Sequence, residues 1–419
     1  MHGISIALTL SMAAHGWGGG HTVIRERAIT CLPEWQQELL GDVAPTLCRD
    51  YAALQDQHAG GTRPDLDAYC KPEGATVSLH DVNAVPASTI AFRWYLQRIR
   101  ECVQAGDIDE AAHFLGVLCH WVEDTGSMSL HCTEGFINEP SLRELIPPPD
   151  DKRGRHYLYA ASGISDTGRY DMPETEDHTP VLLGRTSEEA ALHIQRRQRL
   201  QARAARQIVV PFVMDEMHGD GSLSAKLRGQ LVSNASRTSA DIIYTALCLA
   251  TGRVEGDTPQ LDEVPLTDFV SDYRGGKSSP PWRWTPFVLD ACYDQQRHVV
   301  PLEVPGADGP VRFERGVGMG APFALKWTFG PAGVYTRVTA TVGLLPASAE
   351  GTEAAFALLA NGEEIACTEP ISVGDAAQTL EGMLPADGDA IELTLETRLP
   401  DGVSGTGCMA VWGEPKLVR

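Results

Sequence analysis

The spacing of apolar residues changes near Gly252, from a helical period to short alternating runs. Before it, apolar residues recur at helical spacing, with two long periodic segments at about residues 187–217 and 222–251. After it come short alternating runs, separated by Asn-Gly, Asp-Gly and similar turns. A chain of 419 residues is also too long for one compact core. The sequence therefore predicts an α plus β protein, with an all-α domain followed by an all-β sandwich module.

The expected boundaries follow the same composition changes. We expect a leader at 1–16, a helical domain at 17–252, a Pro-, Asp-, Gly- and Ser-rich linker at 253–281 and a β-sandwich at 282–419. Shorter helices are expected at about 25–40, 88–104 and 109–124. The expected strands are at 310–314, 323–329, 335–343, 354–359, 390–399 and 408–412.

The first sixteen residues have features of a secretory signal peptide. Residues 4–10 are mostly apolar, and Ala14-His15-Gly16 has the small-x-small pattern that signal peptidases cleave. The segment lacks the Lys and Arg of strong signals, so a disordered end before a flexible glycine run is the alternative. Cleavage after Gly16 would expose the α-amine of Trp17, whose ordinary pKa is about 7.7–8.0. That amine and the Trp17 carbonyl could chelate a metal, with His21 as a further ligand.

The composition excludes several classes of function. The formal net charge of −22 is unlike that of proteins that neutralise long nucleic acids. Phosphate chemistry would therefore need local cations such as metal ions. After the leader, no apolar run is long enough to span a membrane. We expect a secreted, periplasmic or cell-surface protein.

The helical domain is rich in residue types that bind zinc. His120 and Asp124 are four residues apart, which places both on one face of a helix. Glu123 should lie about 100° away from them and face solvent. Three further candidates flank this pair in the sequence: Asp65, His80 and His131. Singly, each has an ordinary alternative, such as a surface hydrogen bond, a turn or a helix cap.

Together these residues follow an ordered pattern. Trp17, His21, Asp65, His80, the His120–Asp124 pair and His131 occur in this order along the chain. Over about residues 17–250 the chain resembles the zinc-dependent phospholipase C and single-strand nuclease/3′-nucleotidase superfamily. The resemblance implies an all-α fold and a two-zinc centre that hydrolyses phosphodiesters with a zinc-activated water.

The resemblance also implies a role for each residue. One zinc would be held by Asp65, His80, His120 and Asp124, with Asp65 also a candidate general base. The second would be held by Trp17, His21 and the bridging Asp124, and His131 is a further ligand.

A third metal in that family uses another HxxxD/E pair. The nearest candidate here is His156, which has Ala160 in the carboxylate position. Glu189 and His193 form a reversed pair on a long helix, for which a solvated helix face is an equally good explanation.

The β part resembles NPCBM-type carbohydrate-binding modules. The matching stretches include residues 314–321, 335–343, 356–362 and 410–417. A glycan is therefore an expected partner of the module. The main hypothesis is an exported zinc phosphodiesterase of the phospholipase C type, acting on a phospholipid headgroup. The alternatives are a single-strand nuclease/3′-nucleotidase acting on nucleotides, and a non-catalytic protein that binds glycans or cell surfaces.

Overall fold

The computed structural model describes residues 17, 19–58, 63–73, 79, 81–127, 139–153, 177–254, 258–269, 278–283, 285–307 and 309–419. The chain divides into two compact units, residues 1–256 and 257–419. The first is helical and the second consists mainly of strands, which confirms the predicted fold class. The predicted leader at 1–16 lies outside the described residues.

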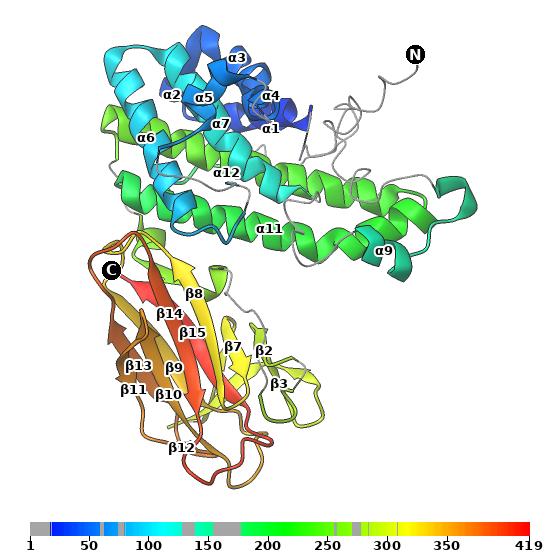
Figure 1. Ribbon diagram of the computed structural model, residues 1–419, viewed down its shortest axis with the longest axis vertical. Coiled ribbons are helices and arrows are strands. Elements are labelled where there is room, and N and C mark those ends of the chain that lie inside the picture. Colours follow the sequence, from blue (N-terminus) through cyan, green and yellow to red (C-terminus); the bar gives the residue numbers. More distant parts are fainter. Residues whose placement is uncertain are drawn as a thin grey trace, which may run out of the picture. The chain divides into compact units, whose positions relative to one another are not determined.

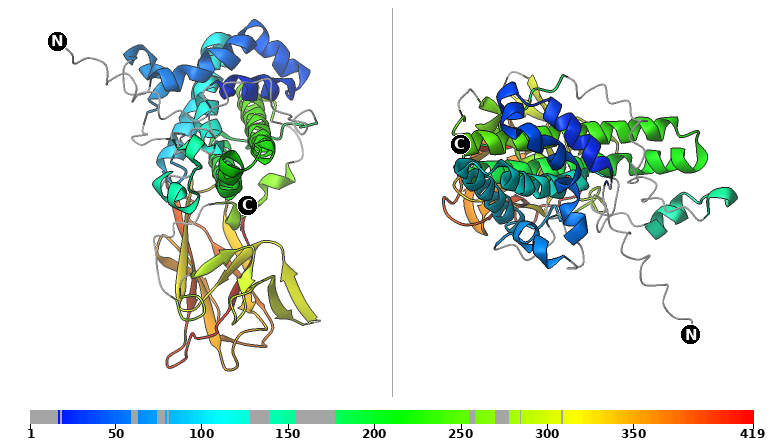
Figure 2. Two further views of the ribbon diagram at one scale, coloured as in Figure 1. Left: turned by 90° about the vertical axis from the view of Figure 1, so that its right-hand side faces the viewer. Right: turned by 90° about the horizontal axis from the view of Figure 1, so that it is seen from above.

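The helical unit is organised around two long helices, α11 and α12, which lie side by side in both figures (Figures 1 and 2). The α-helices are α1 (Gly20–Thr30), α2 (Glu34–Leu40), α3 (Ala44–Arg49), α4 (Leu54–His58), α5 (Asp67–Cys70), α6 (Ala87–Ala105), α7 (Ile108–Glu123), α9 (Glu139–Leu145), α11 (Ser187–His218) and α12 (Ser222–Thr251). The 3-10 turns are η1 (Gly41–Val43), η2 (Tyr51–Ala53), η4 (Pro64–Leu66), η5 (Asp124–Gly126) and η6 (Asp150–Lys152).

Both long helices match their predicted bounds closely, but the helix expected at 25–40 is two helices. The interruption falls at Pro33, which precedes α2 with an extended backbone. Proline has no N–H for the helical ladder and disfavours helical geometry in the residue before it. The chain therefore changes direction between α1 and α2.

The helix α7 runs through the interior of this unit. It packs against α6, α12 and η2, and its last six residues are all buried. The side chain of Asp107 caps its start by accepting a hydrogen bond from the N–H of Glu110. Gly116 lets η2 approach closely, because a Cβ there would lie 2.6 Å from the carbonyl oxygen of Tyr51. This approach places the next carbonyl, that of Ala52, beside the C-terminal half of α7.

In its described residues the β unit has four antiparallel sheets, and the two larger ones form a sandwich (Figure 2, left view). The strands are β1 (Glu263–Pro265), β2 (Phe287–Leu289), β3 (Cys292–Tyr293), β4 (Val299–Val300), β5 (Leu302–Gly306), β6 (Gly309–Phe313), β7 (Gly316–Met319), β8 (Phe323–Phe329), β9 (Arg337–Leu344), β10 (Glu353–Ala360), β11 (Glu363–Cys367), β12 (Ile371–Ser372), β13 (Gln378–Met383), β14 (Ile391–Arg398) and β15 (Ala410–Val418). One sheet has the order β13-β9-β15-β7-β2, with β1 also paired to β15. The other has the order β11-β10-β14-β8, with β12 paired to β10.

Side chains from both sheets meet in the core of the sandwich. Phe356 of β10 and Trp412 of β15 are fully buried, with ring centroids 5.4 Å apart in an edge-to-face arrangement. Along β8, residues alternate between the core and the surface. Within the segment expected to be a linker, Glu263–Pro265 forms β1, which pairs with β15.

No helix in the part of the chain that the structure describes combines the length and apolar character needed to cross a membrane.

Candidate metal centre

His120 is fixed at the end of α7 with one ring nitrogen directed into a buried cluster. Its Nδ1 donates to the carbonyl oxygen of Ala52 at 2.8 Å, and the side chain is fully buried. Its Nε2 lies 3.3 Å from Oδ2 of Asp124 and 3.6 Å from Oδ1 of Asp56. Since a carbonyl oxygen only accepts hydrogen bonds, Nδ1 carries the proton and Nε2 faces the two carboxylates.

His21 reaches the same cluster from α1. Its Nδ1 lies 2.6 Å from Oε2 of Glu123, and its Nε2 lies 3.1 Å from Oδ1 of Asp124. The His21 ring stacks on that of His120, with centroids 4.3 Å apart and planes inclined by 23°. Two imidazoles from distant parts of the chain therefore present Nε2 to one carboxylate.

Trp17 joins the cluster through its backbone and its indole. The Trp17 N–H donates to Oδ1 of Asp124 at 3.3 Å, and the indole Nε1 donates to the carbonyl oxygen of Glu123 at 2.6 Å. The side chain is 1% exposed. Glu123 and Asp124, which are consecutive, thus hold both Trp17 and His21.

The donor atoms of this cluster fit a zinc-type ion. One ligand atom each from His21, Asp56 and His120 lies within 4.8 Å of the others. Asp124 contacts both imidazoles, as described above. Imidazole nitrogens and carboxylate oxygens are the donors that zinc takes in proteins. The residues that are present therefore form a candidate metal centre.

The electrostatics of the cluster favour a bound cation. Burial alone lowers the pKa of His21, but hydrogen bonds and charges from Asp124 and Glu123 raise that pKa to about 9. Burial raises the pKa of Asp124, but His120 and His21 hold it well below its ordinary value. Burial likewise opposes ionisation of Glu123, yet Arg25 and His21 lower its pKa to about 2. Both buried carboxyl groups thus stay ionised at neutral pH and attract positive charge.

Four of the predicted site residues lie elsewhere or outside the described residues. Asp65 is 58% exposed, and its carboxylate pairs with Arg63 at 2.6 Å, so it is not in the donor group. His80, His131 and His156 lie outside the described residues. The structure brings together Trp17, His21, His120 and Asp124.

Asp56 was not among the predicted site residues. The prediction that the side chain of Glu123 faces solvent is wrong. Glu123 is 1% exposed, because the last turns of α7 are covered on every side. Two signals could have revealed this. The run from Phe114 to Val122 is almost entirely apolar, which is typical of a buried helix. Arg25 also follows His21 by four residues, so a charge lies on the same face of α1.

The reversed pair on α11 has a structural role. Glu189 is 3% exposed, and its Oε2 accepts a hydrogen bond from the N–H of Arg185 at 2.7 Å. His193 is 1% exposed. The explanation of a solvated helix face is therefore wrong for both residues, and Glu189 helps to cap the start of its own helix.

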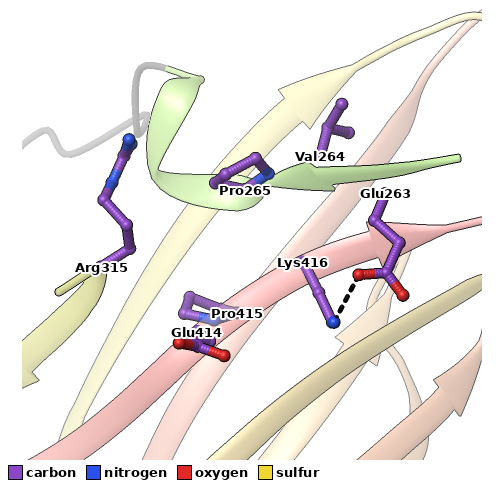
Figure 3. A pocket seen from close by; sticks show the side chains of 7 residues that line it. All are labelled: Glu263, Val264, Pro265, Arg315, Glu414, Pro415 and Lys416. Atoms are coloured by element: carbon purple, nitrogen blue, oxygen red, sulfur yellow. Dashed lines mark hydrogen bonds and ion pairs between the residues drawn. The ribbon is translucent and has the colours of Figure 1, made fainter. Parts of the chain in front are cut away.

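A pocket of about 280 Å³ lies on the β unit, around β1 and β15 (Figure 3). Lys416 pairs with Glu263 at 2.5 Å across its rim. Arg315 is held by Asp268 and also by Asp290 at 3.3 Å. Both cations are thus bound by acidic neighbours, and the pocket by itself identifies no ligand.

Comparisons with known proteins give one family match. Residues 268–418 match the NPCBM/NEW2 domain. No curated protein matches the chain.

Several solved structures resemble the chain weakly. A structure of CBM51-2 with GlcNAc and INT domains from Clostridium perfringens ZmpB has 17% identity and a TM-score of 0.30. The match covers 38% of this chain and 31% of that one, so the chain spans about a third of that structure. The CBM51 from Clostridium perfringens GH95 in complex with methyl-galactose has 16% identity, a TM-score of 0.31, and coverages of 37% and 99%.

An alpha toxin from Clostridium absonum matches along most of both chains. Its identity is 11%, its TM-score is 0.32, and the match covers 95% of this chain and 99% of that one. Similarity at this level assigns neither a ligand nor an activity to this chain. The family match places an NPCBM/NEW2-type module at residues 268–418.

Proposed function

We propose that the helical unit is a zinc-dependent phosphodiester hydrolase of the phospholipase C type. The main observation in support of this proposal is that the two carboxylate oxygens of Asp124 face different candidate ligands. Oδ1 faces the Trp17 nitrogen and His21 Nε2, whereas Oδ2 faces His120 Nε2. A carboxylate that bridges two ions needs this division, and the resemblance of the sequence to two-zinc phosphodiesterases agrees with it.

The ligands on each side of Asp124 would hold the ions. His21 and the Trp17 amine would serve one zinc, and His120 with Asp56 the other, with Asp124 shared. Zinc in such a centre would lower the pKa of water and offset the negative charge of a phosphodiester. Asp56 is 22% exposed, at the edge of the cluster, where its carboxylate can accept a proton from an entering water. In this proposal Asp56 has the role that the family resemblance gives to Asp65, because Arg63 binds the carboxylate of Asp65.

The exported state is part of the proposal. Trp17 can supply an amine only if the chain begins there, which requires cleavage after Gly16. The Trp17 nitrogen lies 3.3 Å from Oδ1 of Asp124, so cleavage after Gly16 would leave an amine against a buried carboxylate. The protein would then act outside the cytoplasm, as secreted, periplasmic or surface-bound material.

We propose a phospholipid headgroup as the substrate, ahead of a nucleotide. The net charge of −22 disfavours approach of a long nucleic acid at low ionic strength. The same charge does not oppose a zwitterionic headgroup such as phosphocholine.

Hydrolysis by the full processed chain tests the proposal. Phosphatidylcholine vesicles, single-stranded DNA and a 3′-nucleotide would be compared with and without a chelator. The variant Asp124→Asn should lose at least about 100-fold in turnover. Asp107→Asn is the matched control at the other end of α7, where Asn also caps a helix well. Chelator-insensitive turnover, or full turnover by D124N, would contradict the proposal.

For the β-sandwich we propose glycan binding. The match of residues 268–418 to the NPCBM/NEW2 domain supports it. If the helical unit proved inactive, this module would carry the function of a non-catalytic surface-binding protein. A glycan array probed with the full chain would test this, and no retention on any glycan would contradict it.

A further inference from the structure

We propose that Glu123 is a positioning residue that aims His21 at the metal. It would do so by holding Nδ1 of His21, so that Nε2 is directed at Asp124 and the ion. This inference rests on the proposed function and extends it to the buried hydrogen-bond network around Glu123.

Glu123 is held by side chains from two other helices. Its Oε2 faces His21 Nδ1 at 2.6 Å, and its Oε1 accepts from Ser239 Oγ of α12 at 2.7 Å. Arg25 of α1 donates to both oxygens, from Nε at 3.1 Å and from Nη2 at 3.3 Å. All four side chains are at most 2% exposed. The carboxylate is therefore bound on both oxygens and has little freedom to rotate.

Arg25 is itself fixed by the backbone. Its Nη2 donates to the carbonyl oxygen of Gly116 at 2.6 Å, and its Nη1 to that of Leu47 at 3.2 Å. A planar guanidinium held in this way presents a rigid pair of donors to Glu123. The orientation of Glu123 is thus determined by α3, α7 and α12 together with α1.

This arrangement decides which nitrogen of His21 is available. An ionised carboxylate only accepts hydrogen bonds, so Nδ1 of His21 must carry a proton. The nitrogen that remains to bind a metal is Nε2, which faces Asp124. His120 follows the same rule through the Ala52 carbonyl, but a carboxylate partner makes an imidazole a stronger ligand than a neutral carbonyl does.

The same residue also holds the predicted N-terminus. The Glu123 carbonyl accepts the hydrogen bond from the Trp17 indole at 2.6 Å. Residue 123 therefore orients both candidate ligands on the Oδ1 side of Asp124, one through its side chain and one through its backbone. A side-chain substitution should disturb His21 and leave the contact with Trp17 intact.

The test measures zinc affinity in the full processed chain by competition with a chromophoric chelator. Glu123→Gln should weaken zinc binding by about 10- to 100-fold, the range for residues that orient metal ligands. It should also change the visible spectrum of the cobalt-substituted protein, which reports ligand geometry.

A second pair of variants separates positioning from folding. Ser239→Ala removes one hydrogen bond to Glu123 but keeps every charge, and it should weaken zinc binding measurably. Ser236→Ala is the matched control, because Ser236 is equally buried on α12 and its hydroxyl bonds to Val232 within the same helix. It should leave both the affinity and the cobalt spectrum unchanged.

Three outcomes overturn the inference. Equal zinc affinity and identical cobalt spectra for the wild type and E123Q would contradict the positioning role of Glu123 and leave the proposed zinc centre intact. Equal losses in S239A and S236A would reduce the network to a folding role. A wild-type chain that binds no zinc contradicts the proposed function and this inference together.

Discussion

The rings of His21 and His120 stack 4.3 Å apart, although the two residues are nearly a hundred positions apart in the chain. Each ring has its Nδ1 bound to a protein acceptor, Glu123 for one and the Ala52 carbonyl for the other. Two stacked imidazolium ions would repel each other in a buried site. With a metal ion on each Nε2 the imidazoles would be neutral, and the proposed centre gives His21 one ion and His120 the other, with Asp124 shared.

Variants of Asp56 and Asp65 test which of the two aspartates binds zinc. Asp56→Asn should lower zinc affinity by about 10-fold or more, because Asp56 belongs to the candidate donor group with His21 and His120. Asp65→Asn should change it little, because the Asp65 carboxylate is bound by Arg63. Both affinities can be measured by chelator competition. The reverse ranking would show that Asp65 is the ligand, as the family resemblance implies, and would reject the assignment of Asp56.

Asp56 and Asp65 show which parts of the site can be predicted from the sequence and which cannot. Local periodicity is visible in the sequence itself. It predicts the fold class, the bounds of α11 and α12, and the placement of His120 and Asp124 on one helix face. The proximity of Asp56 to His120 depends on the close approach of η2 to α7 at Gly116, and no local pattern encodes that approach. The burial of Glu123 similarly needs Arg25 and Ser239 from two other helices.

Blocking the N-terminus should weaken the centre. A chain that starts one residue before Trp17 would carry an amide nitrogen in place of the amine, so the Trp17 nitrogen could no longer bind a metal. We expect a loss of about 10-fold or more in zinc affinity at one of two sites, with thermal stability of the metal-free protein unchanged. Isothermal titration of both forms would detect it. Identical titrations would mean that the Trp17 nitrogen is not a ligand.

The close approach at Gly116 gives a stability prediction. Gly116→Ala places a methyl group 2.6 Å from the Tyr51 carbonyl oxygen, so η2 must move away from α7. We expect a loss of about 1–3 kcal/mol in the free energy of unfolding, as for other overpacked sites. Because Ala52 holds His120, zinc affinity should fall as well. Chemical denaturation with and without zinc measures both effects, and an unperturbed variant would contradict the geometry.

The buried His193 should make the free energy of unfolding depend on pH below neutrality. Burial, with the charges of Arg196 and Arg197, lowers its pKa from 6.5 to about 3. Between these values the unfolded chain binds a proton at His193 and the folded chain does not, so stability falls as pH decreases from 6.5. The contribution is at most about 1.4 kcal/mol per pH unit.

Denaturation of the metal-free protein between pH 6.5 and 4.5 measures this effect, because Glu123 contributes only at lower pH, between 4.5 and about 2. His193→Gln should flatten the dependence of unfolding free energy on pH. Ser236→Ala, at a buried residue of α12 that does not titrate, is the control and should keep the wild-type slope. Equal slopes for all three proteins would contradict the neutral, buried state of His193.

The metal content of the protein would decide whether Trp17, His21, His120 and Asp124 form a zinc centre. Protein processed by its own leader would be analysed for zinc by elemental analysis, with Asp124→Asn prepared in parallel. We expect about two zinc ions per wild-type chain and fewer than one in the variant. Zinc well below one ion per wild-type chain, after exposure to excess metal, would contradict it.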